Sequence, residues 1–453
     1  MSEELRACWK RSWLFRAALV TAAAWALLRL AVHGLYLATL LNPTLLGAAG
    51  TGEWDDTPQI PVDLALYRDA AQRLLAHADL YPTAARIEVY QYSPFFALLF
   101  VPFLLLPLGW LVTVHSLLHL GAYALLYLCW GRLLRVSPAA RRALAGMLPL
   151  WLVFSAFWAD LGYLNIYIPV ALLGSLLIEA VLAQRLGAAL LWLALILPAK
   201  PHWAFPILLP LLLGQWRFFA RLASGGLAIY AALVCVTLAI VGPRYGVQQY
   251  AGYLRLLASL RDQFPWRGPE APFLGYNHSI TQVVVYLLGV SPTTLRLATI
   301  VKGLLLTPLA ATGLSLVLLR VRGLGRLPSW FGLELALALY LGTFIWLDMV
   351  WEVSLGAAVF AYLVGMQPRP PARIAHGILF VPYALVDLWQ VLSLAVFGTR
   401  VLAPGPYVLT DPSVYLPLTL GVIVAFYGSI LWRLWQAMRG KPLPQRHSEV
   451  EPC

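Results

Sequence analysis

The first candidate for chemistry in this chain is a carboxylate. Asp63 lies in the segment 61–71, and apolar or small residues follow it at the spacing of one helix face: Leu64, Tyr67, Ala71, Leu74 and Leu75. We therefore predict an amphipathic helix along a membrane surface, with Asp63 at its N-cap, where a short acidic side chain suits the helix dipole. A carboxylate in this place could accept a proton during catalysis or could serve only as a cap. The local sequence leaves both interpretations open.

Other polar groups stand at the ends of apolar segments. Lys200 and His202 belong to Pro-Ala-Lys-Pro-His-Trp, where a lysine could hold a phosphate as a point charge or could extend to lipid headgroups. His278, in Gly-Tyr-Asn-His-Ser, could carry a proton or bind a phosphate, although such a histidine is often only a hydrogen-bonded loop residue. Further candidates on the same predicted face are Asp160, Asn165, Asn277, Asp348, Glu352 and three arginines that could hold an anion, Arg255, Arg261 and Arg267.

Composition identifies the elements that must position these groups. Of the 453 residues, 61% are hydrophobic and only 11% are charged, whereas about a quarter are charged in typical soluble domains. Continuous apolar runs of bilayer length recur from end to end, which predicts membrane-spanning helices. The net charge of +12 arises from basic residues in short loops between these runs. The positive-inside rule explains that excess without a nucleic-acid partner.

We predict an all-α, polytopic transmembrane bundle of about twelve spans, with both termini cytoplasmic and the candidate polar groups outside. The membrane domain would cover residues 1–437, with a first external loop at 42–93 that contains amphipathic helices and a second external loop at 243–279. Residues 438–453 would form a disordered cytoplasmic tail. Residues 95–107 are short for a crossing, so we interpret them as a half-span or re-entrant segment.

Three acids, Glu179, Glu334 and Asp387, fall inside predicted spans. Ionisable groups within a membrane are functional candidates by default, and these three keep a transporter or flippase of a lipid-linked sugar, or of another polar solute, open as an alternative. The sequence contains no Walker loop, no Rossmann fingerprint and no metal-binding motif. Nothing in it therefore indicates ATP-driven transport, a cofactor or a metal.

Several short motifs appear in a defined order along the first 300 residues. They are Val-Asp-Leu-Ala-Leu-Tyr (62–67), Ala-Asp-Leu-Tyr (78–81), Tyr-Gln-Tyr-Ser-Pro-Phe-Phe (90–96), Gly-Tyr-Leu-Asn (162–165), Lys-Pro (200–201) and Asn-His-Ser (277–279). This combination resembles the GT-C superfamily of polyprenyl-phosphate-sugar-dependent glycosyltransferases, and within it glycosyltransferase family 87, the bacterial α-mannosyltransferase-like proteins. The chain departs from the family pattern at three places: His77 replaces a glycine, Ser93-Pro94 replaces Pro-Pro, and Tyr163 replaces a glutamine.

The resemblance implies a plasma-membrane enzyme that transfers a hexose, such as mannose, with inversion. The donor would be a polyprenyl-phosphate sugar, and the acceptor an extracytoplasmic glycolipid, glycan or protein. In the superfamily the aspartate of the first external loop is the catalytic base, which corresponds to Asp63 here. Expected substrate contacts are Tyr67, Asp160, Asn165, Lys200, His202, Asn277 and His278. Neither a metal nor a cofactor is implied. A ligase that uses an undecaprenyl-diphosphate donor would share such a site and differ in the donor alone.

Overall fold

The protein was analysed as a computed structural model that describes residues 2–42, 60–82, 90–271, 277–321, 327–350, 353–367, 369–389, 392 and 412–440. Throughout these residues the secondary structure is helical, without a strand. Nearly half of the predicted first external loop, at 43–59 and 83–89, lies outside the described residues, as do 272–276 of the second loop and 441–453 of the tail. The all-α prediction is therefore confirmed for the described part of the chain.

Among the described helices, four are long and apolar enough to cross a bilayer: α2 (Trp13–Leu41), α6 (Leu108–Leu133) with its short extension to Val136, α13 (Trp216–Val241) and α16 (Pro292–Val321) over Pro292–Leu319. Many side chains of α2, α13 and α16 are apolar and exposed, as expected of surfaces that face lipid. The other apolar helices are shorter. They include α10 (Tyr167–Leu182), α11 (Leu186–Ile196), α17 (Phe331–Trp346) and α18 (Gly356–Met366). Two further helices, α19 (Pro370–Ala384) and α21 (Pro412–Met438), follow α18 in the chain. These helices indicate a membrane-embedded protein.

The apolar run at 143–160, which in the sequence has the length of a single span, is broken. The structure divides it among α7 (Pro138–Gly146), α8 (Leu148–Leu152) and α9 (Ser155–Tyr163), with a bend of 54° after Gly146. Pro149 at the start of α8 accounts for the break, because proline cannot donate the backbone hydrogen bond that would continue α7. Hydropathy alone does not show such an interruption.

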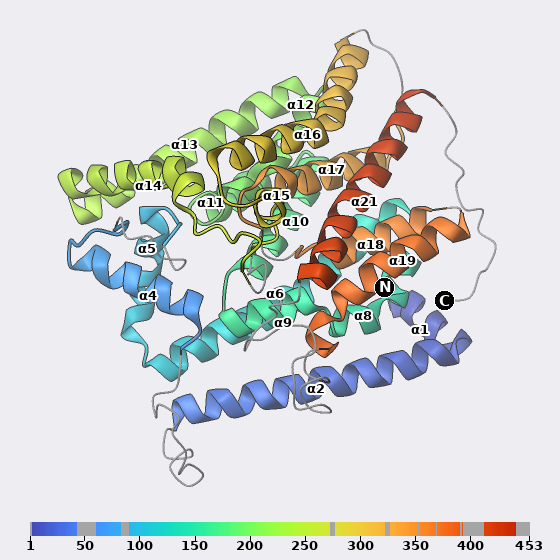
Figure 1. Cartoon of the computed structure of the whole chain (residues 1–453), viewed down its shortest axis with the longest axis horizontal. Helices are drawn as coiled ribbons and strands as arrows, with labels where there is room; N and C mark the ends of the chain where they lie inside the picture. Colours follow the sequence, from blue (N-terminus) through green and yellow to red (C-terminus); the bar gives the residue numbers. More distant parts are fainter. Residues whose placement is uncertain are drawn as a thin grey trace.

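The polar regions that we predicted as external loops also contain helices. The first holds α4 (Val62–Leu75), whose apolar face packs on α5 (Pro94–Phe100) and on the 3₁₀ helix η1 (Val101–Leu105). The second predicted loop begins with a 21-residue helix, α14 (Pro243–Gln263). Figure 1 shows α4, α5 and α14 together at one end of the molecule, with α1 (Ser2–Arg11) at the opposite end. The short length of α5 and η1 agrees with the interpretation of 95–107 as a segment that does not cross.

Ion pairs join helices that are distant in sequence. Arg29 of α2 contacts Asp387 at 3.1 Å, and Arg132 of α6 contacts Glu179 of α10 at 2.8 Å. In the core between α17 and α21, Arg433 Nε donates to Glu334 Oε1 at 2.6 Å. Each of the three acids that fell in predicted spans therefore has an arginine partner.

The buried pair between α17 and α21 gives the first prediction. Glu334 is fully buried and also accepts a hydrogen bond from Tyr362, so Arg433→Met would leave an uncompensated carboxylate in the core. We expect a loss of about 3–5 kcal/mol in stability. Thermal unfolding in detergent, followed by tryptophan fluorescence, measures it. The double variant Arg433→Met/Glu334→Gln should recover most of the loss, and a single variant as stable as the parent would contradict the prediction.

Candidate functional site

Helix α4 presents Asp63 at the end of the molecule that it shares with α5 and α14. Its buried residues are Leu64, Tyr67, Ala70, Ala71 and Leu74, which confirms the predicted face except for Leu75, whose side chain is exposed. The N-cap prediction was wrong, because Pro61 occupies that position and Asp63 is the second helical residue. Asp63 is partly exposed in the first turn, where the helix dipole still favours a carboxylate.

Tyr67 lies one turn after Asp63, and its hydroxyl connects α4 to two other segments of the chain. Its hydroxyl lies 2.9 Å from the hydroxyl of Tyr92 and 3.4 Å from Oδ1 of Asn165, which also accepts from Tyr92 at 3.5 Å. Burial raises the pKa of the Tyr67 phenol well above its usual range, and the charges of Tyr92 and Asp63 add to this effect. Tyr67 therefore stays neutral and connects α4, the segment before α5, and the start of α10.

Asp160 and Asn165 hold the N-terminus of α10. The Asp160 carboxylate accepts hydrogen bonds from the backbone N–H groups of Tyr167 at 3.3 Å and Ile168 at 2.9 Å, while Asn165 Oδ1 accepts from the N–H of Ile166 at 2.7 Å. Both side chains are buried. Asp160 thus satisfies helix donors that have no partner within the helix. The structure gives these two predicted contact residues a positioning role next to Asp63.

Lys200 lies in the break between α11 and the 3₁₀ helix η3 (Pro201–Ile207). Its side chain is 8% exposed, with Nζ 3.4 Å from the ring centroid of Tyr167 and 5.3 Å from that of Tyr92. Burial lowers the pKa of this lysine to about 8, and the negative charges of Asp63 and Asp160 act in the opposite direction. A cation, two aromatic faces and two carboxylates are therefore coupled in one place.

A cavity of about 330 Å³ opens beside Lys200. Its lining includes His202 from η3, Tyr253 from α14 and Lys302 from α16. The volume falls in the range of small-molecule sites. Three cations line it, namely Lys200, Arg261 and Lys302, together with a single carboxylate, that of Asp348. This balance of charge favours an anionic ligand.

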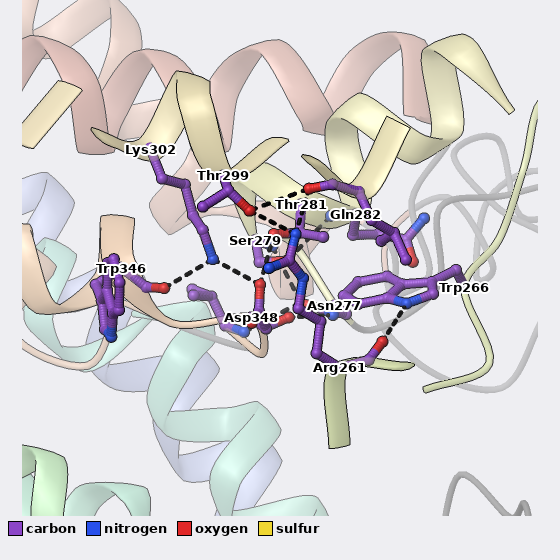
Figure 2. A network of polar contacts seen from close by, with 12 residues as sticks. Arg261, Trp266, Asn277, Ser279, Thr281, Gln282, Thr299, Lys302, Trp346 and Asp348 are labelled. Carbon is purple, nitrogen blue, oxygen red and sulfur yellow. Dashed lines mark hydrogen bonds and ion pairs between the residues drawn. The ribbon is translucent and has the colours of Figure 1, made fainter. Parts of the chain in front are cut away.

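Part of the cavity lining, including Arg261, Lys302 and Asp348, belongs to a hydrogen-bonded network (Figure 2). Asp348 Oδ1 accepts from Lys302 Nζ and from Thr281 Oγ1, both at 2.6 Å. Lys302 also donates to the carbonyl oxygen of Trp346 at 2.9 Å, and Arg261 donates to Thr299 Oγ1 at 2.5 Å. Lys302 is not among the residues that we singled out from the sequence. A single lysine within an apolar run is itself the signal that could have found it.

Asn277 belongs to the same network (Figure 2), although neither it nor His278 lines the cavity. Asn277 Nδ2 donates to the Asp348 carbonyl at 2.8 Å, and its Oδ1 accepts from the N–H groups of Ser279 and Val350. His278 is buried, and its backbone N–H donates to the carbonyl of Val350 at 2.7 Å. Asn277 thus joins the segment 277–281 to 348–350, and Asp348 and Met349 of the latter line the cavity.

Of the predicted site residues, Lys200 and His202 line the cavity, and the other six do not. The charges of Asp63 and Asp160 act on Lys200, and Tyr67 hydrogen-bonds Asn165. Asn277 donates to the backbone of Asp348, which lines the cavity. Tyr92 and Tyr167 were not singled out from the sequence, although both contact Lys200. Among the described residues, no three His, Cys, Asp or Glu side chains are arranged to hold a metal ion.

Comparison with known proteins adds no relative: no protein-family model matches the chain, and neither a curated protein nor a solved structure is significantly similar to it.

Proposed function

We propose that this protein is a membrane glycosyltransferase that moves a hexose, such as mannose, from a polyprenyl-phosphate sugar to an extracytoplasmic glycolipid, glycan or protein. The observation that carries the proposal is the coupling of the Asp63 carboxylate to a buried lysine at the edge of a cation-lined cavity. A base and a phosphate-binding cation are the two groups that such a transfer requires. The motif resemblance points to the same aspartate.

In the proposed reaction, Asp63 takes the proton of the acceptor hydroxyl as that oxygen attacks the anomeric carbon. The new bond forms on the face opposite the bond to the phosphate, which breaks, so the configuration inverts. The phosphate leaves as an anion that needs no protonation, and the positive charge of Lys200 stabilises it. Tyr67, Asn165 and Asp160 hold Asp63 and Lys200 in place through the contacts of α4 and α10.

One backbone feature supports the family resemblance that underlies the proposal. His77, which stands where the family pattern has glycine, has a φ of +54°, in the left-handed region that glycine adopts without strain. The imidazole stacks on Tyr245 of α14, with 4.7 Å between the ring centroids. The chain thus keeps the turn that ends α4 while replacing the residue that most easily forms it.

The proposal includes a GT-C arrangement of about twelve spans in the plasma membrane, both termini cytoplasmic and the cavity outside. Membrane lipids would surround the apolar helices, and the lipid chain of the donor would lie among them. We propose neither a metal nor a cofactor for the reaction.

The transporter alternative relied on Glu179, Glu334 and Asp387, and the arginine partners of these acids weaken it. Cysteines introduced at positions 63, 200 and 278, in a chain without its own cysteines, test the alternative with a membrane-impermeant thiol reagent. The enzyme proposal expects labelling from outside only. Labelling that alternates between the two faces with substrate present would favour transport.

The direct test is transfer of radiolabelled mannose from a polyprenyl-phosphate donor into acceptors of a membrane extract. We expect a labelled product that depends on the protein. A panel of other polyprenyl-phosphate sugars extends the test to the identity of the hexose. A matched diphosphate donor separates the proposed enzyme from the ligase. Purified, correctly inserted protein that turns over none of these donors would refute the proposal.

A further inference from the structure

Both ring nitrogens of His119 face oxygen atoms inside the protein. This histidine lies on α6 and is fully buried. Its Nδ1 is 2.7 Å from the carbonyl oxygen of His115. Its Nε2 contacts the carbonyl oxygen of Asn165 and lies 3.4 Å from Oδ2 of Asp160.

The chemistry of these neighbours fixes where the protons lie. Carbonyl oxygens only accept hydrogen bonds, so Nδ1 and Nε2 must both donate, and an imidazole with two N–H groups carries a positive charge. Asp160 is the acid within reach of Nε2, and its carboxylate also accepts two backbone N–H groups at the N-terminus of α10. A neutral His119 would place an unprotonated nitrogen against a carbonyl oxygen in a site without water access.

We propose that His119 is a permanent imidazolium, and that its ion pair with Asp160 is a positioning device for Asp63. The contacts form a continuous path. His119 holds the backbone of Asn165, the side chain of Asn165 accepts from Tyr67, and Tyr67 stands one turn after Asp63 on α4. The choice of Asp63 as the group that is positioned rests on the proposed function, whereas the ion pair does not.

The charged and titratable groups around the imidazolium come from four helices and from the segment that holds Lys200. His115 precedes it on α6, and His33 of α2 lies beyond Ser116, with 2.8 Å between its Nε2 and the serine hydroxyl. Asp160 of α9 is the acid in contact. The charges of Asp63 and Asp160 both act on Lys200. The nearest full charge of opposite sign is therefore Asp160.

The protonation state is measured by nitrogen-15 NMR of protein labelled at its eight histidines, with His119 assigned from the signals lost in His119→Gln. We expect both ring nitrogens of His119 to remain protonated from about pH 6 to 8, a range in which an ordinary histidine becomes neutral. One unprotonated ring nitrogen of His119 at neutral pH would overturn the proposal. If no variant folds, an unprotonated ring nitrogen on every one of the eight histidines at pH 8 would also overturn it.

The counter-ion is tested with Asp160→Asn, which keeps the shape of the side chain and removes its charge. His119 should then lose one proton at neutral pH, whereas Asp69→Asn on the surface of α4 should leave its spectrum unchanged. A doubly protonated His119 in Asp160→Asn would overturn the assignment of the ion pair.

The positioning role is tested by backbone hydrogen exchange, which needs no catalytic assay. In His119→Gln we expect exchange in α4 and at residues 165–168 to be about tenfold faster, and exchange in α17 to be unchanged. His33→Gln, a second histidine that contacts α6, is the matched control. Unchanged exchange in α4 would overturn the positioning role. Absence of transfer activity together with an intact ion pair and the expected exchange would instead refute the proposed function alone.

Discussion

Asp63→Asn should lower the transfer rate by a factor of about 10²–10⁴ while leaving the fold intact. Asparagine matches aspartate in size but cannot accept the proton of the acceptor hydroxyl. Asp63 is partly exposed in the first turn of α4 and is not part of the buried apolar face, so little packing changes. The measurement is the initial rate of product formation with saturating donor, using purified protein in lipid. We expect kcat to fall and donor binding to change little.

The same helix supplies the matched control for this variant. Asp69 lies on the exposed face of α4, where its carboxylate pairs with Arg73 at 2.6 Å. Asp69→Asn removes an equal charge from the same helix, and an exposed pair of this kind contributes little to stability. We expect its rate to match that of the parent protein. Equal rates for Asp63→Asn and the parent would eliminate Asp63 as the base.

Lys200→Met should weaken donor binding, with a cost of about 2–5 kcal/mol for the loss of a buried charge partner. That cost corresponds to roughly a 30-fold or larger rise in the donor dissociation constant. The parent should show a related pH dependence. Because the pKa of Lys200 is about 8, the lysine is cationic below this pH, and affinity for the anionic donor should fall as the pH rises through it. Methionine should abolish that dependence. Equal affinities of parent and variant at pH 7 would refute the assigned role.

Lys200 should also make the stability of the folded protein depend on pH. Stability should rise with pH, whereas donor affinity should fall. Its pKa in the folded protein, about 8, lies below the ordinary value of 10.5, so the unfolded chain binds more protons between these two values. Stability of the parent should therefore rise with pH across that window. Lys200→Met removes the cost of burying a cation, and we expect it to unfold at a higher temperature than the parent at pH 7. Thermal unfolding at pH 7 and pH 10 checks that the stability of the parent rises with pH and that this rise is absent from the variant.

How far sequence predicts this structure depends on how local the determining interactions are. The buried face of α4 follows from residues within four positions of one another, and the pattern predicted it correctly apart from Leu75. The break at Pro149 is equally local, but averaging hydropathy over a bilayer-length window conceals it. Long polar stretches were interpreted as loops, and α14 shows that a polar segment can be helical when one face packs on protein.

In the candidate site, too, local patterns were predictable from the sequence and contacts between distant residues were not. Its polar residues could be assigned to one face from the order of apolar runs, and in the structure the charge of Asp63 acts on Lys200. The hydrogen-bond partners of these side chains could not be predicted, because a sequence does not show which distant backbone atoms will need donors or acceptors. Asn277 illustrates this: three hydrogen bonds involve residues 279, 348 and 350, and a polar motif alone predicted a substrate contact.

The pair between Arg29 and Asp387 has a consequence for synthesis of the chain. Arg29 lies within the first long apolar helix, and 358 residues separate it from its partner. At ordinary translation rates the ribosome needs on the order of 20–70 s to reach the aspartate. During that time α2 is already made, but Asp387 is not yet available as the counter-ion of its arginine. Another group, or water, must therefore compensate the charge of Arg29 in the nascent chain. Chains truncated before residue 387 should therefore be degraded faster than chains that end just after α21, and pulse-chase labelling measures the difference.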